Sequence, residues 1–326
     1  MRKKRRQLSR RETGGISWRK SAMSDRQGNS VGVIGLGAMG MGVARSLVRA
    51  GFEVHACDLR PEALASIAAD GATPHASPAA LAAQVSALVI LVVNADQTES
   101  VLFGPDGAAA KLEPGSVVIA SSTVPPHYAE ELGQRLAAMG LKHLDAPVSG
   151  GAAKAASGEM TIMASGAPDT FAAVEDVLAA IAAKVYRLGD TPGMGSKVKM
   201  INQLLAGVHI AAATEAMALG IRAGIDPKAL YEVISNSAGS SWMFQNRVPH
   251  ILAGDYTPLS AVNIFVKDLG IVLDSGRKLT FPLPLTSAAH QMYLATSAAG
   301  LGGEDDSSVI RMFQKLTGID LPKKGD

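Results

Sequence analysis

The side chain best suited to proton transfer in this sequence is a lysine that shares a helical face with an asparagine three residues further on. Lys199 and Asn202 follow a Gly-Met-Gly segment, 193–195, and open a long stretch of helical pattern. Residues three apart share one face of a helix, whereas Lys197 points elsewhere. A lysine can act as an acid or base when burial and neighbouring charges lower its pKa towards neutrality. The alternative is that both lysines lie on a solvated helix face.

A polar turn and a charged pair are further candidates for binding. The turn, 145–151, reads Asp-Ala-Pro-Val-Ser-Gly-Gly and follows a strand-like piece. Its backbone N–H groups and the Ser149 hydroxyl could hold a carboxylate, although a plain structural turn is the alternative. Lys267 and Asp268 stand together inside an apolar helical stretch, where a surface ion pair is the simplest interpretation.

A glycine-rich loop near the start of the chain predicts a dinucleotide-binding site. The loop follows a strand and opens a helix, which is the context that this fingerprint requires. The first glycine allows a tight turn, the second lets the backbone approach a pyrophosphate, and the third lets helix and strand pack closely. A glycine-rich turn before a packed helix is the alternative. The loop consists of Gly35, Leu36, Gly37, Ala38, Met39 and Gly40.

An acidic residue at the end of the second strand predicts which dinucleotide binds. Asp58 stands 18 residues after Gly40, and a carboxylate there can accept hydrogen bonds from the adenosine ribose hydroxyls. It would also repel the 2′-phosphate of NADP, so NAD is the expected cofactor. Arg60 argues in the opposite direction, because its guanidinium could reach that phosphate. A helix cap before Pro61 is a second role open to Asp58.

Strands alternating with helices place these candidates in an α/β fold. The alternation continues to about residue 190, which predicts a Rossmann-type, doubly wound parallel sheet with right-handed crossovers. After the turn 189–195 the pattern is helical and no strand is expected, so an all-helical part follows. The predicted strands are 31–35, 53–57, 87–93, 117–121, 143–145, 161–165 and 184–187, and the predicted helices include 41–50, 61–70, 77–86 and 196–223.

Length and charge divide the chain into three segments. A chain of 326 residues is long enough for two domains. The expected segments are a basic tail, 1–30, a dinucleotide-binding domain, 31–192, and a helical domain, 193–326. The tail carries ten Lys or Arg against two acids, and with its low apolar content it is expected to be disordered. A chain that starts at Met23 should therefore fold. The remainder carries 21 bases and 27 acids, so no nucleic-acid-binding role is expected.

Composition argues against other classes of protein. No uninterrupted apolar run reaches the roughly 18 residues of a membrane span, and no apolar stretch follows the basic start as a secretory signal would require. The single cysteine, Cys57, rules out an internal disulfide and fits a reducing cytoplasm. The seven histidines are scattered without metal-ligand spacing, so no metal is expected.

The motifs together resemble the β-hydroxyacid dehydrogenase family, which includes 3-hydroxyisobutyrate, tartronate semialdehyde and threonate enzymes. The glycine loop, the 145–151 turn, the Gly-x-Gly-x-x-x-Lys-x-x-Asn pattern and the Lys-Asp-Leu segment occur in the family's order. The resemblance covers roughly residues 31–320. Segments 240–244, 254–256 and 304–307 are most similar to the threonate branch of the family.

This resemblance implies a role for each candidate residue. It makes Lys199 the acid/base and Asn202 a group that holds substrate, and it assigns the substrate carboxylate to Ser149, Gly150 and Gly151. The implied cofactor-binding residues are Gly35, Leu36, Gly37, Ala38, Met39, Gly40, Asp58, Asn94, Thr123 and Lys267, with Ser122 and Thr123 beside the nicotinamide. One position departs from the pattern, because many members have a second asparagine where this chain has Gln203.

The reaction implied is the NAD-dependent oxidation of a small hydroxycarboxylate. For L-threonate the oxidised carbon would be C2, and the product a 2-oxo acid. The alternatives are 3-hydroxyisobutyrate oxidation, reduction of tartronate or succinic semialdehyde, and a non-catalytic dinucleotide sensor. Imine reductases share the architecture but lack the lysine, so Lys199 argues against them. The family usually forms dimers or tetramers, so a homodimer or homotetramer is expected.

Overall fold

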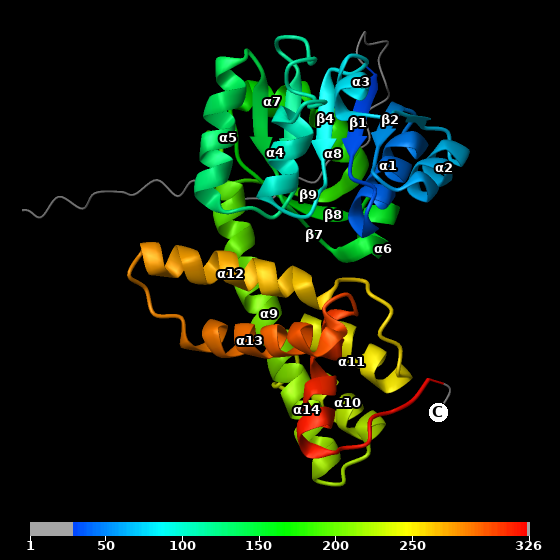
Figure 1. Ribbon diagram of the computed structural model, residues 1–326, viewed down its shortest axis with the longest axis vertical. Helices are drawn as coiled ribbons and strands as arrows, with labels where there is room; N and C mark the ends of the chain where they lie inside the picture. Colours follow the sequence, from blue (N-terminus) through cyan, green and yellow to red (C-terminus); the bar gives the residue numbers. More distant parts are fainter. Residues whose placement is uncertain (1–28, 325–326) are drawn as a thin grey trace, which may run out of the picture.

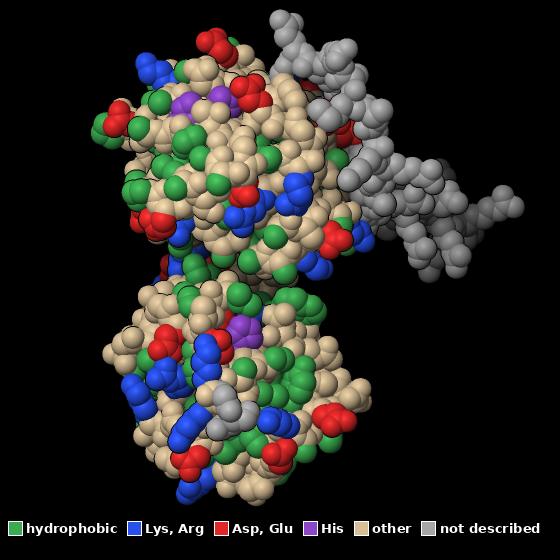
Figure 2. Space-filling model, turned by 90° about the vertical axis from the view of Figure 1, so that its right-hand side faces the viewer, with side chains coloured by type: hydrophobic (Ala, Val, Ile, Leu, Met, Phe, Trp, Pro, Cys, Tyr) green, Lys and Arg blue, Asp and Glu red, His purple; other side chains and the backbone are tan. Residues whose placement is uncertain are grey.

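The computed structural model describes residues 29–324 of the chain. The expectations for the basic tail therefore lie almost wholly outside the described residues. The chain forms two bodies, one built on a sheet and one of helices, and Figure 2 shows a narrow waist between them.

Six parallel strands form the central sheet of the first body (Figure 1), in the order β3-β2-β1-β4-β5-β6. Parallel pairing runs throughout, for example from Val31 to Val54 on one side and to Ala87 on the other. Adjacent β1 and β4 mark the point where the strand order reverses, at which doubly wound sheets bind ligands. The strands are β1 Ser30–Ile34, β2 Glu53–Cys57, β3 Thr73–Pro74, β4 Ala87–Ile90, β5 Val117–Ala120 and β6 Lys142–Asp145.

Helices cover both faces of this sheet, as the alternating pattern predicted. Successive strand residues point to opposite faces, so Val31 and Val89 join the core under α1, while Leu88 and Ile90 join the core under α3, α4 and α5. Four of the five helices have proline near their start or a capping side chain, features that favour a helix N-terminus. They are α1 Ala38–Arg49, α2 Pro61–Ala69, α3 Pro78–Ala82, α4 Ala95–Phe103 and α5 Pro126–Ala138.

A second, three-stranded sheet corrects the expectation of a single parallel sheet. β7 Val148–Ser149 pairs antiparallel with β8 Met160–Ala164, which pairs parallel with β9 Ala182–Arg187. The chain can turn sharply after Ser149 because two glycines follow. The predicted strand pieces 161–165 and 184–187 thus exist but belong to this smaller sheet. Its connecting helices are α6 Gly151–Ser157, α7 Pro168–Ala173 and α8 Glu175–Ile181.

Everything after β9 in the described chain is helical apart from loops and one isolated bridge, as predicted. The long helix α9, Met194–Arg222, runs from the sheet body through the helical body (Figure 1). The helices packed around it are α10 Pro227–Ser235, α11 Trp242–Ala253, α12 Val262–Lys278, α13 Pro284–Thr296 and α14 Ile310–Thr317, with the short turns η1 Ser297–Leu301 and η2 Asp306–Val309.

The helix α9 also bears on the question of a membrane span. It is the one helix within residues 29–324 whose length and mean hydropathy would suffice to cross a membrane, although the sequence has no uninterrupted apolar run of that length. Its neighbours α11, α12 and α13 pack against it, and its buried side chains, such as Ile210 and Met217, belong to the helical core. Packing thus covers part of the helix surface, and 44% of its most apolar 18-residue window is buried.

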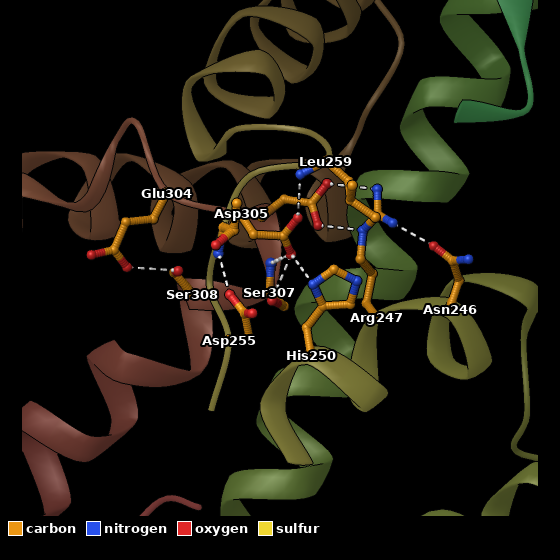
Figure 3. Close-up of polar contacts among 11 residues, drawn as sticks. Asn246, Arg247, His250, Asp255, Leu259, Glu304, Asp305, Ser307 and Ser308 are labelled. Atoms are coloured by element: carbon orange, nitrogen blue, oxygen red, sulfur yellow. Dashed lines mark hydrogen bonds and ion pairs between the residues drawn. The ribbon is translucent and has the colours of Figure 1, made fainter. Parts of the chain in front are cut away.

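A buried polar cluster joins α11 to the start of η2 (Figure 3). Arg247 pairs with Asp306 across 2.6 Å, and the Asp306 side chain is fully buried. The neighbouring Asp305 carboxylate accepts hydrogen bonds from the backbone N–H groups of Leu259 and Ser307, at 3.1 Å each. These contacts fix the start of η2 against α11 and the loop at Leu259.

Candidate active site

The loop between β1 and α1 has the geometry that a pyrophosphate requires. Gly35 has a φ of 91°, which favours glycine, and its N–H donates to the carbonyl oxygen of Cys57 at 2.9 Å. A Cβ on Gly40 would lie 1.8 Å from the carbonyl oxygen of Gly35, so this close packing requires glycine. A Cβ on Gly37 would meet nothing within 4 Å. The backbone there is open at the start of α1, and these residues fit a dinucleotide phosphate.

Asp58 lies beside this loop, just after β2. Its carboxylate accepts a hydrogen bond from the backbone N–H of Leu36 at 2.6 Å. The Arg60 guanidinium approaches the same group, with Nε 3.0 Å from Oδ1. Burial raises the pKa of Asp58, but the hydrogen bonds from Arg60 and Leu36 outweigh it, and the pKa lies below its ordinary value. The two side chains that bear on NAD or NADP binding therefore form one ion pair.

Further candidates follow β4 and β5 at the carboxyl edge of the sheet. Asn94 caps α4, because its Oδ1 accepts a hydrogen bond from the backbone N–H of Gln97 at 2.8 Å. The carbonyl oxygen of Thr123 accepts a hydrogen bond from Lys267 Nζ at 2.9 Å. The neighbouring Ser122 hydroxyl is buried and finds no hydrogen-bond partner within the described residues. A buried hydroxyl without a partner fits an edge that takes a polar ligand.

The predicted carboxylate-binding turn joins β7 to α6. Gly150 and Gly151 follow Ser149 with φ values of 133° and 74°. α6 packs on α1, where Ser46 Oγ donates to the carbonyl oxygen of Ala155 at 2.9 Å. The turn is thereby held beside the helix that follows the dinucleotide loop. In Figure 1 β7 and α6 lie on the side of the sheet body that faces the helical body.

Asp145 is a structural element of the site to which the sequence pattern attached no role. It lies at the end of β6 with 1% of its surface exposed. Its carboxylate accepts hydrogen bonds from the backbone N–H groups of Gly193 and Ser196, each at 2.9 Å, and from the hydroxyls of Ser196 at 2.7 Å and Ser165 at 3.1 Å. An acceptor at a helix start satisfies its unpaired N–H groups. Asp145 therefore anchors the first turn of α9 to the sheet.

Lys199 lies in the second turn of α9 and is 8% exposed. Its Nζ donates a hydrogen bond to Gln203 Oε1 at 2.8 Å. Burial lowers the pKa of Lys199 to about 8, while the Asp268 charge opposes this shift and the Lys267 charge adds to it. Lys197 points away from Lys199, as the helix register requires. Its Nζ pairs with Glu130 at 2.8 Å near the surface.

A chain of polar contacts connects Lys199 to α12. Gln203 Nε2 donates to Asp268 Oδ2 at 2.5 Å, and Asp268 Oδ1 lies 2.7 Å from Lys267 Nζ. Asn202 Nδ2 also donates to Gln203 Oε1, at 3.1 Å. Asp268 is only 2% exposed, so the surface ion pair considered for Lys267 and Asp268 is a largely buried one.

The structure thus brings the predicted residues together in groups. The first group is Lys199, Asn202 and Lys267, joined through Gln203 and Asp268, with Thr123 bonded to Lys267. The second is Asp58 with the dinucleotide loop. No direct bond joins Ser149 to Lys199 within residues 29–324. Sequence reasoning assigned no individual role to Asp145 or Asp268, because their partners Gly193 and Gln203 lie 48 and 65 positions away in the chain.

Two family models match consecutive parts of the chain. Residues 30–189 match the NAD binding domain of 6-phosphogluconate dehydrogenase. Residues 193–313 match the model described as NAD-binding of NADP-dependent 3-hydroxyisobutyrate dehydrogenase. The fold and the glycine loop thus define a nicotinamide dinucleotide-binding dehydrogenase.

Similar proteins place the chain within that class. It is 67% identical over 297 residues to an L-threonate dehydrogenase of Cupriavidus necator, covering 91% of this chain and 99% of that protein. An Escherichia coli L-threonate dehydrogenase is 54% identical over 293 residues, or 90% and 96% of the two chains. A crystal structure of a 3-hydroxyisobutyrate dehydrogenase from Salmonella typhimurium matches with a TM-score of 0.84 and 56% identity, covering 87% and 99%. The chain belongs to the 3-hydroxyisobutyrate dehydrogenase-like, or β-hydroxyacid dehydrogenase, family.

Proposed function

We propose that this protein oxidises L-threonate at C2 with NAD and releases the 2-oxo acid, 2-oxo-tetronate. The observation that carries the proposal is the buried Lys199, whose lowered pKa suits a base near neutral pH. The choice of L-threonate rests on the relatives that carry that name. The choice of NAD rests on the ionised Asp58 beside the dinucleotide loop.

The residues would act on a substrate held between the two bodies. The Ser149 turn binds the carboxylate, and Asn202 fixes the hydroxyl that reacts. Lys199, neutral before the reaction, accepts the hydroxyl proton at Nζ. A bound nicotinamide supplies the acceptor for the hydride. The protein contributes alignment and proton transfer, because the hydride must leave C2 and the proton must leave its hydroxyl oxygen in one geometry.

A panel of hydroxy acids tests this proposal. The expected result is that NAD reduction with L-threonate has a higher kcat/KM than with D-threonate, 3-hydroxyisobutyrate, glycerate or 4-hydroxybutyrate. Identification of the product by mass spectrometry as a 2-oxo acid would place the oxidation at C2. A higher kcat/KM with any other acid of the panel would reassign the substrate.

A second candidate is 3-hydroxyisobutyrate oxidation. It is favoured by the name of the Salmonella typhimurium structure, which is 56% identical to this chain. Both reactions use a carboxylate-binding turn and a lysine base, but the carbon that reacts is C2, next to the carboxylate, in L-threonate and C3, one carbon further away, in 3-hydroxyisobutyrate. The same panel distinguishes them, because 3-hydroxyisobutyrate has a methyl group on C2 where L-threonate has the hydroxyl that reacts.

The proposal extends to domain organisation and assembly. We place the domain boundary between residues 192 and 193, which is supported by the two family models, one ending at residue 189 and the other beginning at residue 193. A homodimer or homotetramer is supported by exposed apolar side chains on the helical body, among them Leu219, Trp242 and Leu285, and Figure 2 shows apolar areas on one face of that body. Light scattering would measure the assembly. A cytoplasmic location is consistent with the buried, unpaired Cys57.

A further inference from the structure

Gln203 stands between the two charged side chains nearest the proposed chemistry. Its amide bonds Lys199 Nζ at one end and Asp268 Oδ2 at the other, over 2.8 Å and 2.5 Å. The side chain is buried. It is also the position at which this chain departs from the asparagine found in many β-hydroxyacid dehydrogenases, so its contacts are not explained by the roles that the resemblance supplies.

The chemistry of its neighbours determines how this amide is oriented. A carboxylate can only accept hydrogen bonds, so the amide nitrogen of Gln203 must face Asp268. An ammonium can only donate, so the amide oxygen must face Lys199. Both partners therefore require the same orientation of the Gln203 amide.

The Gln203 amide keeps the Asp268 carboxylate from direct contact with the Lys199 amine. Were the Asp268 carboxylate in direct contact with Lys199, the resulting ion pair would stabilise the protonated amine, which cannot accept a proton. The neutral amide separates the charges while it keeps Nζ in a fixed place. Asp268 is at the same time paired with Lys267, which bonds Thr123 at the sheet edge.

The remaining charged groups around Lys199 have other partners. Asp268 and Lys267, both on α12, are the two whose charges act on it. On the sheet side, Asp145 accepts its bonds from the first turn of α9. Glu130 on α5 pairs with Lys197.

We propose that Gln203 is a positioning residue, which holds the Lys199 amine as a usable base by placing a neutral amide between it and Asp268. The role deepens the proposed dehydrogenase function and rests on it for the kinetic test. It predicts that two substitutions of similar length at this position move the proton affinity of Lys199 in opposite directions.

The first variant, Gln203→Met, removes the hydrogen-bond acceptor of Lys199. A hydrogen bond to the charged form favours that form, so its loss lowers the pKa of Lys199 and moves the rising limb of kcat/KM to lower pH. The amine is also less well placed, and kcat should fall roughly 10- to 100-fold, with KM for NAD little changed.

The second variant, Gln203→Glu, brings negative charge to Nζ. When the new carboxyl shares one proton with Asp268, part of the negative charge of the pair lies on residue 203, and when the pair holds no proton a full charge does, so in both states negative charge lies closer to the amine than in the wild type. An opposite charge this close raises the pKa of a lysine, and the limb should move to higher pH by about one unit or more. The matched control is Thr214→Val on the same helix, where a buried hydroxyl bonds the Ala211 carbonyl oxygen at 2.9 Å. Thr214→Val should leave the rising limb of kcat/KM at its wild-type pH.

A measurement without substrate or NAD separates this role from the proposed function. Competitive acylation with acetic anhydride across a pH series, read by mass spectrometry, reports the pKa of Lys199 with Lys197 as an internal reference. Opposite shifts in the Met and Glu variants support the role even if L-threonate proves not to be a substrate. Unchanged Lys199 titration in both variants, with a lowered unfolding midpoint, would make Gln203 a packing residue and overturn the proposal.

Discussion

Lys267 of α12 donates a hydrogen bond from Nζ to the backbone carbonyl oxygen of Thr123, over 2.9 Å. Thr123 follows β5 in the sheet body, whereas Lys267 belongs to the helical body. The same ammonium lies 2.7 Å from the Asp268 carboxylate. One side chain therefore ties the sheet edge, where the nicotinamide is expected, to the polar contacts that reach Lys199.

Replacing this lysine should affect binding and rate together. In Lys267→Ala, Thr123 loses its bond to α12 and Asp268 loses its ion pair. A hydrogen bond to a charged group contributes about 1.5–3 kcal/mol, so we expect kcat/KM to fall roughly 10- to 100-fold, with a higher KM for NAD. Steady-state kinetics with NAD varied measures this. Arg277→Ala, which removes an exposed ion pair with Asp274 on the same helix, should have almost no effect, and an equal loss in both variants would contradict the assignment.

The sequence could predict what depends on local spacing. The glycine loop, Asp58 and the register of Lys197 and Lys199 follow from strand and helix periods, and the structure has them as expected. The small second sheet was not predicted, because β7 has only two residues and its pairing depends on a turn. The contact between Gln203 and Asp268 joins residues 65 apart in the chain, and only the packing of α9 on α12 reveals it.

The proton-transfer role of Lys199 can be tested against its neighbour in the sequence. Lys199→Ala should lower kcat by roughly 10²–10⁴-fold, the usual contribution of a general base, while NAD binding is largely kept. Lys197→Ala should be mild, since that ammonium is half exposed and paired with Glu130. A dead Lys197→Ala enzyme beside a normal Lys199→Ala enzyme would refute the register on which the site is built.

The pH dependence of the wild-type enzyme follows from the same residue. A lysine must be neutral to accept a proton, and burial lowers the pKa of Lys199 to about 8. Hence kcat/KM should rise with pH through about 8 and level off above it. Only the Lys199 variant should lose this rising limb. A profile that falls with increasing pH over the same range would mean that the protonated amine is the active form in this direction.

Cofactor choice depends on Asp58 and Arg60 acting as a pair. The wild-type enzyme should have a higher kcat/KM with NAD than with NADP, because the ionised carboxylate repels a 2′-phosphate. In the wild-type protein the Arg60 guanidinium lies 3.0 Å from the Asp58 carboxylate. Asp58→Ser frees this guanidinium to bind the 2′-phosphate, so the ratio of kcat/KM with NAD to kcat/KM with NADP should fall. Arg60→Gln is the matched control and should keep the preference for NAD. Wild-type preference for NADP would instead make Arg60 a phosphate ligand.

The helical body offers a prediction about stability rather than catalysis. Arg247 and Asp306 form an ion pair in which the aspartate side chain is fully buried. Burial raises the pKa of Asp306 to about 7, although the Arg247 charge opposes the shift. Removing one partner of a buried pair leaves an uncompensated charge, which typically costs about 3–5 kcal/mol. Because a carboxyl with a pKa of about 7 can take up a proton instead, at about 1.4 kcal/mol for each pH unit above 7, we expect the charge of Asp306 to contribute at most about 1.4 kcal/mol to the loss in free energy of unfolding of Arg247→Met at pH 8, measured in urea.

The dependence of that loss on pH distinguishes a buried charge from lost packing. The carboxyl pKa is higher in the folded than in the unfolded protein, so the stability that Asp306 contributes is present at low pH and decreases as pH rises through about 7. Without Arg247 the folded pKa rises further. The destabilisation of Arg247→Met should therefore be larger at pH 8 than at pH 5, by up to about 1.4 kcal/mol. Arg247→Met combined with Asp306→Asn has no charge to leave unpaired, so its loss should be smaller at pH 8 and nearly independent of pH. An equal loss for Arg247→Met at both pH values would assign the effect to packing of the arginine side chain instead.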